Sequence, residues 1–252
     1  MNLHAIPDIP LVSPGDDLAS VIIGCMEKAD VGVVSGDIIV IAQKIVSKAE
    51  DRYVDLSTIS PSSQARQLAE KVDKDPRLVH LILSESDQVV GHRPGVLIVA
   101  HRLGYVIANA GIDVSNLGPG SNVGEQVLLL PKDSNASSAR LRSALESYFH
   151  KTVGVIISDS IGRAWRNGSI GTALGSAGVP ALWDRIGEQD LFGRVLQVTQ
   201  VGYADQVAAA AALMMGEGAE GLPVVKVAGL DWKPVTADAN MLLRPKDQDL
   251  FR

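Results

Sequence analysis

The chain has 252 residues, of which 46% are hydrophobic and 21% are charged, as in an ordinary globular protein with a substantial core. Its net charge of -6 gives no general attraction for nucleic acid or for an anionic membrane. The single cysteine, Cys25, excludes an internal disulfide and a cysteine-based zinc site. No apolar run approaches the roughly 20 residues of a membrane-spanning helix, so we expect a cytoplasmic protein that binds neither nucleic acid nor membrane.

Helical spacings and apolar runs are interleaved along the chain without a regular strand–helix–strand repeat. Helices are expected over residues 18–29, 60–73, 137–148 and 205–215, with Ser134 or Ser137 capping the third. Strands are expected over 38–42, 153–157, 195–201 and 222–227, a hairpin over 96–108 and a loop over 117–124. This order predicts an α+β fold with mixed sheets and helices. We expect a single unit over residues 1–252, with two closely associated lobes as the alternative.

The stretch 152–175 carries the densest set of candidate ligands. The apolar run 153–157 has the composition of a strand buried on both faces, and the pattern predicts that it ends just before Asp159 and Ser160. A carboxylate and a hydroxyl at that position are hard-oxygen ligands suited to Mg²⁺ or Mn²⁺. Arg163 and Arg166 follow, and a guanidinium binds phosphate or carboxylate with two parallel hydrogen bonds. The alternative is that Asp159 caps the next segment and that both arginines are merely solvated.

Three separate turns, each after an apolar segment, combine an acidic residue with Gly, Ser or Asn, and the acidic residues are Asp113, Asp159 and Glu217. If those segments are neighbours, the carboxylates can hold divalent cations that bridge the oxygens of a nucleoside triphosphate. Lys44 and Lys48 would then offset the remaining phosphate charge. Spacing in the sequence does not by itself show that these residues converge.

Several common nucleotide and hydrolase motifs are absent from the sequence. It has no Gly-x4-Gly-Lys-Ser/Thr loop and no dinucleotide-binding fingerprint followed by an acidic residue at the proper distance. It also lacks the Gly-x-Ser-x-Gly elbow of serine hydrolases. Any nucleotide site must therefore be of another kind.

Motifs in a fixed order carry a resemblance that covers nearly the whole chain. They are AQKIVSKAE at 42–50, ANAGIDVSN at 108–116 and SDSIGR at 158–163, joined by residues 190–193 and 216–223. Together they resemble the coenzyme F-420-0:L-glutamate ligase family. The resemblance implies a GTP-dependent ligase that adds one or more L-glutamates to the lactyl carboxylate of a deazaflavin phosphodiester precursor. It also implies an acyl-phosphate intermediate, Mg²⁺ or Mn²⁺, stimulation by K⁺, and an intertwined homodimer.

The resemblance also implies roles for individual residues. Asp113 and Asp159 would hold one cation, and Ser160 with Glu217 a second. Position 160 is often Thr in the family and position 217 commonly Gln, so Ser160 keeps the hydroxyl whereas Glu217 adds a negative charge. Arg163 and Arg166 are the candidate catalytic contacts of substrate carboxylate or phosphate. Nucleotide contacts are expected from Ile9, Pro10, Leu11, Val12, Gln43, Lys44, Lys48, Asn116, Met215, Gly216, Glu217, Gly218, Ala219, Glu220, Gly221 and Leu222.

Two other functions remain open from the sequence. The same acidic residues would serve a metal-dependent nucleotide phosphohydrolase, which releases phosphate from GTP without an organic acceptor. A non-catalytic nucleotide-binding protein is the second alternative.

Overall fold

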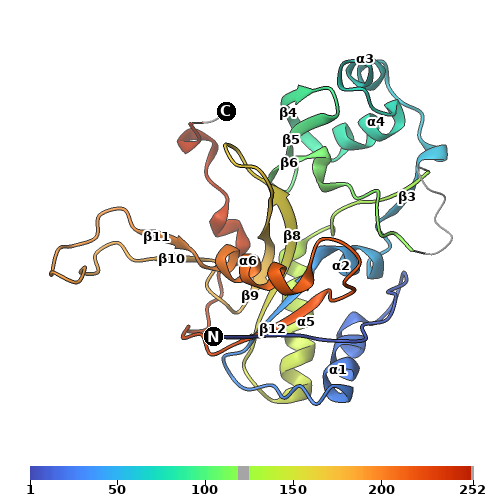
Figure 1. The fold of residues 1–252 in the computed structure, drawn as a ribbon. Coiled ribbons are helices and arrows are strands. Elements are labelled where there is room, and N and C mark those ends of the chain that lie inside the picture. Colours follow the sequence, from blue (N-terminus) through green and yellow to red (C-terminus); the bar gives the residue numbers. More distant parts are fainter. Residues whose placement is uncertain (119–124, 251–252) are drawn as a thin grey trace.

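The computed structural model describes residues 1–118 and 125–250, so only the first two residues of the expected loop over 117–124 lie within it. Its centre is a five-stranded sheet in the order β1–β12–β2–β8–β9 (Figure 1). The strands are β1 (Asn2–Ala5), β12 (Val224–Ala228), β2 (Ile38–Ala42), β8 (Gly154–Gly162) and β9 (Ser169–Ala177). Only β2 and β8 run parallel, and the other neighbours are antiparallel. The expected α+β fold with mixed sheets is therefore confirmed.

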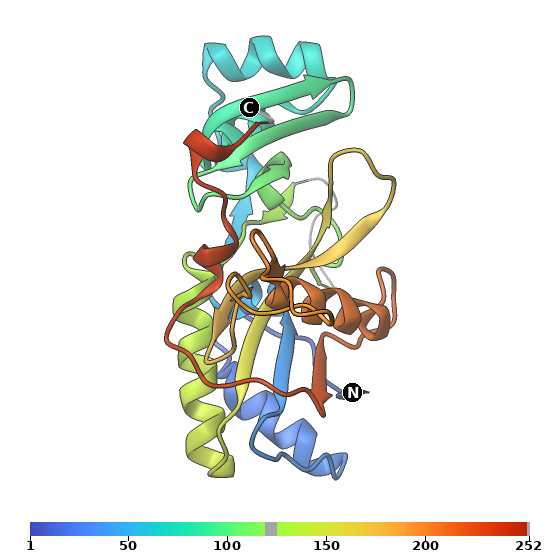
Figure 2. The same ribbon diagram turned by 90° about the vertical axis from the view of Figure 1, so that its left-hand side faces the viewer.

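Helices cover both faces of this sheet, which explains why β2 is apolar at every position (Figures 1 and 2). On one face, Ile39 and Ile41 pack in a core with α1 (Leu18–Lys28) and α5 (Ser134–Phe149). On the other face, Ile38 and Val40 pack against α6 (Tyr203–Met215). A strand whose alternate residues enter two separate cores cannot show the apolar–polar alternation of a half-exposed strand.

The sequence pattern predicts that strand β8 ends at residue 157, but the strand continues to Gly162. Its parallel pairing with β2 stops at Ser158, but its antiparallel pairing with β9 continues to Gly162, after a register shift between Ile157 and Ser158. Asp159 and Ser160 therefore lie within the hairpin, which extends beyond the edge of β2. The capping alternative for Asp159 is also wrong, because this residue stands inside a strand rather than before a helix.

Two further expectations about local structure are wrong. The strand expected over 195–201 is reduced to β11 (Gln200–Gly202), paired with β10 (Leu182–Asp184). Upstream, Val195 forms an isolated bridge with Gln189, and Val195 and Val198 are 51% and 84% exposed, so little apolar packing supports a longer strand. Helix α5 begins at Ser134, and its cap is Asp133, whose Oδ1 accepts from the Ala136 amide at 2.9 Å. A carboxylate one residue upstream replaces the expected serine cap.

A second group of elements forms its own apolar cluster beside the main sheet. It comprises α3 (Ser63–Val72), α4 (Pro76–Ser84) and the antiparallel sheet β4 (Ser86–Arg93), β5 (Val96–His101) and β6 (Val106–Ala108), which confirms the expected hairpin. The short elements α2 (Gln43–Ala49), β3 (Tyr53–Asp55) and β7 (Gln126–Leu128) connect the two groups. Within residues 1–118 and 125–250, no helix combines the length and the apolar character that crossing a membrane requires.

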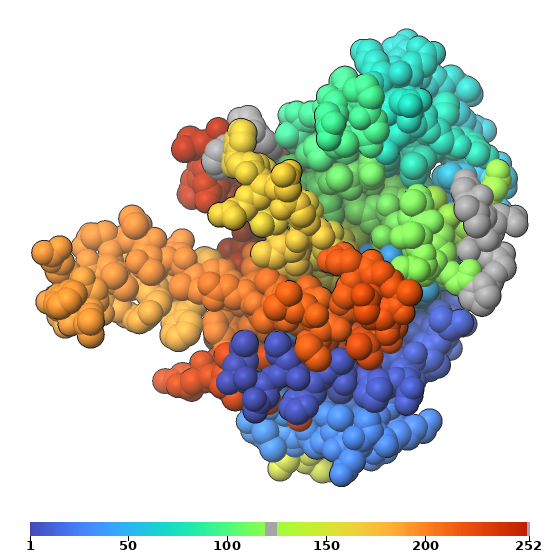
Figure 3. All heavy atoms as spheres, in the orientation of Figure 1, coloured from blue at the N-terminus to red at the C-terminus, as the bar shows by residue number. Residues whose placement is uncertain are grey.

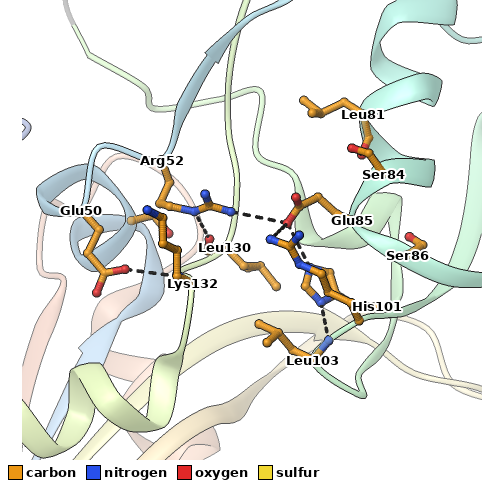
Figure 4. A network of polar contacts seen from close by, with 12 residues as sticks. Glu50, Arg52, Leu81, Ser84, Glu85, Ser86, His101, Leu103, Leu130 and Lys132 are labelled. Carbon is orange, nitrogen blue, oxygen red and sulfur yellow. Dashed lines mark hydrogen bonds and ion pairs between the residues drawn. The ribbon is translucent and has the colours of Figure 1, made fainter.

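A polar network built on Glu85 lies where these two groups meet (Figure 4). The buried carboxylate pairs with Arg102 at 2.9 Å and Arg52 at 3.4 Å, and His101 Nε2 stands 3.7 Å away. The other ring nitrogen of His101, Nδ1, accepts the Leu103 amide at 2.9 Å, so the ring is held in its neutral form with the proton on Nε2. Burial, reinforced by the charges of both arginines, lowers the pKa of His101 to about 4.

Candidate functional site

A pocket of about 710 Å³ opens where β2 ends beside the middle of β8, and segments far apart in the chain surround it. They are the N-terminal stretch 9–12, the start of α2, residues 113–118, the middle of β8 and the loop that follows α6. Figure 3 shows that loop in orange-red, between the dark blue N-terminal segment and the green segment around residue 116. The Asn116 side-chain amide donates to the Gly218 carbonyl at 3.3 Å and so links the two loops across the pocket.

The structure brings most of the sequence-predicted site residues into this pocket. Its walls include Ile9, Pro10, Leu11, Val12, Gln43, Lys44, Lys48, Asp113, Asn116, Asp159, Ser160, Met215, Gly216, Glu217, Gly218, Ala219, Gly221 and Leu222. Glu220 is not part of the wall, and its carboxylate instead accepts the Gly218 amide at 2.8 Å and braces the loop. Arg163 and Arg166 also stand apart, in the turn beyond the end of β8.

Some residues of the pocket wall are not among the site residues predicted from the sequence. Ser115 and Ser158 are two of them, and each is adjacent in sequence to a predicted site residue, which is the signal that could have identified it. Gly171 and Ala212 give no such signal, because β9 and α6 approach each other there through long-range packing. A Cβ on Gly171 would lie 2.5 Å from the Ala208 carbonyl oxygen, so only glycine permits this contact.

Asp113 and Asp159 reach the pocket from different parts of the fold. Residue 113 forms an isolated antiparallel bridge with Leu128, and its carboxylate accepts from Gln43 Nε2 at 2.7 Å and pairs with Lys44 Nζ at 3.3 Å. Burial raises the pKa of Asp113, while the nearby Lys44 charge and the Gln43 hydrogen bond oppose that rise. Burial and the neighbouring Asp113 charge raise the pKa of Asp159 to about 7. The two carboxyl groups therefore share one region of the pocket.

An unusual backbone turn precedes Asp113. Asn109, Ala110 and Gly111 all have positive φ, at 51°, 55° and 66°, which makes one left-handed turn. Alanine is strained in this conformation, but the side chain of Ala110 is buried in the second apolar cluster. A Cβ on Gly111 would lie 2.8 Å from Leu130 Cδ1, so this position also lacks room for a side chain. The turn fixes the direction in which the chain enters the bridge that holds Asp113.

Ser160 and Glu217 form a second pair at the pocket wall. The Ser160 hydroxyl donates to Glu217 Oε1 at 2.7 Å, and the Ser169 hydroxyl, on the neighbouring strand, donates to the same oxygen at 3.3 Å. In the part of the chain that the structure describes, no group of three His, Cys, Asp or Glu side chains is placed so that it could hold a metal ion. The acidic residues thus occupy the pocket as two separate sets.

Two lysines of α2, Lys44 in its first turn and Lys48 in its last, add positive charge next to these carboxylates. Lys48 is buried, and its ammonium donates to the Asn116 carbonyl at 2.7 Å. Burial, together with the charge of Lys44, lowers the pKa of Lys48. The Lys44 ammonium also donates to the Ser115 carbonyl, at 3.3 Å. The pocket therefore joins oxygen ligands and ammonium groups, the combination that a nucleoside triphosphate with a divalent cation requires.

Comparison with known families identifies the group to which this fold and pocket belong. A family model described as F420-0:Gamma-glutamyl ligase matches residues 7–229. The chain belongs to this family. A Coenzyme F420:L-glutamate ligase of Methanothermobacter thermautotrophicus is 41% identical over 254 residues, covering 100% of this chain and 99% of that protein. Two further proteins of the same name are also similar. The one from Methanocaldococcus jannaschii is 43% identical and covers 86% of this chain and 85% of that protein. The one from Methanopyrus kandleri is 42% identical and covers 100% of this chain and 98% of that protein.

The match to the F420-0:gamma-glutamyl ligase family spans every segment that builds the pocket, from the stretch 9–12 to the loop 215–223. It also includes two features outside the pocket wall, namely the β8–β9 turn with Arg163 and Arg166 and the projecting segment that contains β10 and β11. Those features belong to the same family unit as the pocket.

Proposed function

We propose that this protein is a ligase that joins L-glutamate to the carboxylate of the coenzyme F-420 precursor at the expense of GTP. The observation that carries the proposal is the convergence of Asp113, Asp159, Lys44 and Lys48 in one pocket, from segments that are distant in sequence. The full-length similarity to proteins named Coenzyme F420:L-glutamate ligase supports this choice of substrates.

The oxygen ligands of the pocket fit a divalent cation. Asp113 and Asp159 are close enough for the charge of one to raise the pKa of the other, an arrangement that a cation between them would stabilise. Asp113 and Asp159 would hold one Mg²⁺ or Mn²⁺, and Ser160 with Glu217 a second. Bound there, the ions would withdraw negative charge from the phosphates of GTP. We also propose that K⁺ stimulates the activity, and no ligand for K⁺ is assigned.

The chain's own residues then position the reactants. Lys48 and Lys44 offset the phosphate charge, and the walls formed by residues 9–12 and 215–222 hold the nucleotide. A carboxylate oxygen of the acceptor attacks the γ-phosphorus, the bond to the β-phosphate oxygen breaks, and GDP leaves with an acyl phosphate remaining. The amine of glutamate then attacks the acyl carbon, loses a proton and expels inorganic phosphate. Arg163 and Arg166 would bind the acidic groups of the acceptor.

Incubation of the protein with GTP, Mn²⁺, L-glutamate and the deazaflavin phosphodiester precursor tests this function. We expect equal amounts of GDP and of a product whose mass has increased by one glutamyl residue or more. Phosphate release from GTP at the same rate without either organic substrate would instead indicate a phosphohydrolase. An Asp159→Ala variant that keeps its only measurable activity, the binding of nucleotide or partner, would indicate a non-catalytic protein.

The assembly proposed with this function is a homodimer. The segment around β10 and β11 projects far from the body (Figure 1, orange), and its Leu191, Phe192 and Val198 are 91%, 85% and 84% exposed. Such a group of exposed apolar side chains favours coverage by a second copy of the chain. Light scattering on the wild type should give twice the monomer mass of 26.6 kDa, whereas a Leu191→Ser, Phe192→Ser double variant should give the monomer. Val34→Ser, which changes an exposed apolar residue elsewhere, serves as the control.

A further inference from the structure

The turn that joins β8 to β9 displays a large aromatic side chain between two arginines. Trp165 is 86% exposed, and its φ of 65° places it in the left-handed region, which is rare for a bulky residue. That conformation is unfavourable for a residue with a side chain, and most of the indole surface is exposed to water. Sparsely populated backbone conformations persist mainly where the surrounding structure enforces them, often in ligand-binding elements.

The charges beside Trp165 are positive. Arg163 and Arg166 are both exposed, and Arg163 Nη1 donates to the Gly168 carbonyl at 3.1 Å, which closes the base of the turn. Within the described ranges, neither guanidinium is within ion-pair distance of a carboxylate. Both are therefore available to an anion without having to break an existing ion pair.

The turn closes the β8–β9 hairpin (Figures 1 and 2), whose strand β8 also carries residues of the pocket wall. Ser160 lies in the pocket wall, and Trp165 follows five residues later in the turn, so their Cα atoms are at most about 16 Å apart. Ser160 pairs with Gly171 and Gly162 with Ser169, so these four small residues share one face of the hairpin, the face whose hydroxyls contact Glu217. A Cβ on Gly162 would meet no atom within 4 Å, so this face is open at Gly162, while Glu217 contacts it at Ser160 and Ser169 and α6 packs against it at Gly171.

We propose that the β8–β9 turn is the binding site for the distal end of the acceptor. This inference rests on the proposed function, in which the acceptor has a carboxylate at one end, a phosphodiester and a planar aromatic ring at the other. With its carboxylate in the pocket, the acceptor extends past Gly162, where the face is open, to the turn. Arg163 and Arg166 bind its phosphodiester, and its ring stacks on the indole of Trp165. The turn thus selects acceptors that combine an anionic linker with an aromatic ring.

Two acceptors separate the contributions of the indole and the arginines. The complete precursor carries the ring, and a truncated phosphodiester of lactate lacks it. Trp165→Ala should weaken binding of the complete precursor roughly tenfold, as expected for loss of one aromatic stacking contact. It should leave binding of the truncated acceptor unchanged, and Trp165→Phe should restore most of the lost affinity. Arg166→Gln and Arg163→Gln should each weaken both acceptors about tenfold. Arg66→Gln, on the exposed face of α3, should weaken neither.

Equilibrium titration with each acceptor, and a parallel titration with a fluorescent GDP analogue, measure these effects. Nucleotide affinity should be the same in all variants, because the turn lies outside the pocket wall. Equal affinity of wild type and Trp165→Ala for the complete precursor overturns the inference, even where the wild type proves to be a ligase. If the wild type binds the precursor with the expected dependence on Trp165 but forms no glutamyl product, the proposed function fails and this inference stands. If the wild type does not bind the precursor at all, both fail.

Discussion

Gln43 and Asp113, 70 positions apart in sequence, are joined by a hydrogen bond of 2.7 Å from the glutamine amide to the carboxylate. The other end of the Gln43 side chain is also occupied, since its Oε1 accepts from the Ser47 hydroxyl at 2.9 Å. Gln43 is 2% exposed, so its bond to Ser47 is buried, while its bond to Asp113 is buried on the glutamine side and faces the pocket on the other. This pair links the first turn of α2 to the segment that carries the acidic group, and it orients that carboxylate in the pocket.

Gln43→Met should therefore impair both folding and activity. The substitution keeps the size of the side chain but leaves the Ser47 hydroxyl and one oxygen of Asp113 without their partner. We expect a loss of about 1–3 kcal/mol in the free energy of unfolding and at least a tenfold loss of GTP-dependent turnover. Denaturant titration and a GDP-release assay measure the two effects. Gln64→Met, at an exposed position of α3, is the matched control, and equal behaviour of the two variants would refute the assignment.

Replacement of glycine by alanine should have opposite effects on stability at two positions, one in the left-handed turn before Asp113 and one inside α1. Gly111→Ala would place a Cβ 2.8 Å from Leu130 and force φ of 66° on alanine, so we expect a destabilisation of about 1–3 kcal/mol. Gly24→Ala, inside α1, meets no atom within 4 Å and should stabilise the protein by about 0.5–1 kcal/mol.

Thermal unfolding of both variants checks the signs. Gly111→Ala should also weaken Mn²⁺ binding, because a shift of this turn moves Asp113, whereas Gly24→Ala should leave metal affinity unchanged. A Gly111→Ala protein as stable as Gly24→Ala would show that the turn is not strained in solution.

Local patterns account for the elements that the sequence predicts well. The strand β2 and the helix α6 stand out because each is an apolar segment with clear boundaries. Asp113, Asp159 and Glu217 stand out as acidic residues in short segments that also contain Gly, Ser or Asn. The end of β8 could not be predicted, since its continuation to Gly162 depends on pairing with β9 and not on its own composition. The same holds for the left-handed turn at Ala110, which tertiary packing imposes on a residue that normally avoids it. The position of Arg163 outside the pocket follows from that longer hairpin.

Asp159 should make the metal-free protein less stable as the pH rises. Its folded pKa of about 7 lies above the unfolded value of 3.8, so the folded state binds more protons between these limits. The associated stability is fully present below pH 3.8 and is lost as the pH rises to 7, by at most about 4 kcal/mol. Asp159→Asn should therefore be more stable than the wild type above pH 7. Excess Mn²⁺ should reverse that order by stabilising the wild type alone. Equal stability of the two proteins at pH 8, with and without Mn²⁺, would show that residue 159 is neither destabilised by its charge nor a ligand.

Protonation of His101 should make the protein less stable in acid, over a pH range set by the pKa of this residue. The folded pKa of about 4 lies below the unfolded 6.5, so the unfolded state binds the extra proton, and stability falls as the pH drops from 6.5 to 4. The reason is structural, because a proton on Nδ1 would face the Leu103 amide, which already donates to that atom. The loss should reach at most about 3 kcal/mol. His101→Asn retains an acceptor for the Leu103 amide but cannot become charged. Its unfolding free energy, although lower at neutral pH because a buried ring is lost, should fall less steeply between pH 6.5 and 4. Parallel curves for the two proteins over this range would assign the acid sensitivity to other groups.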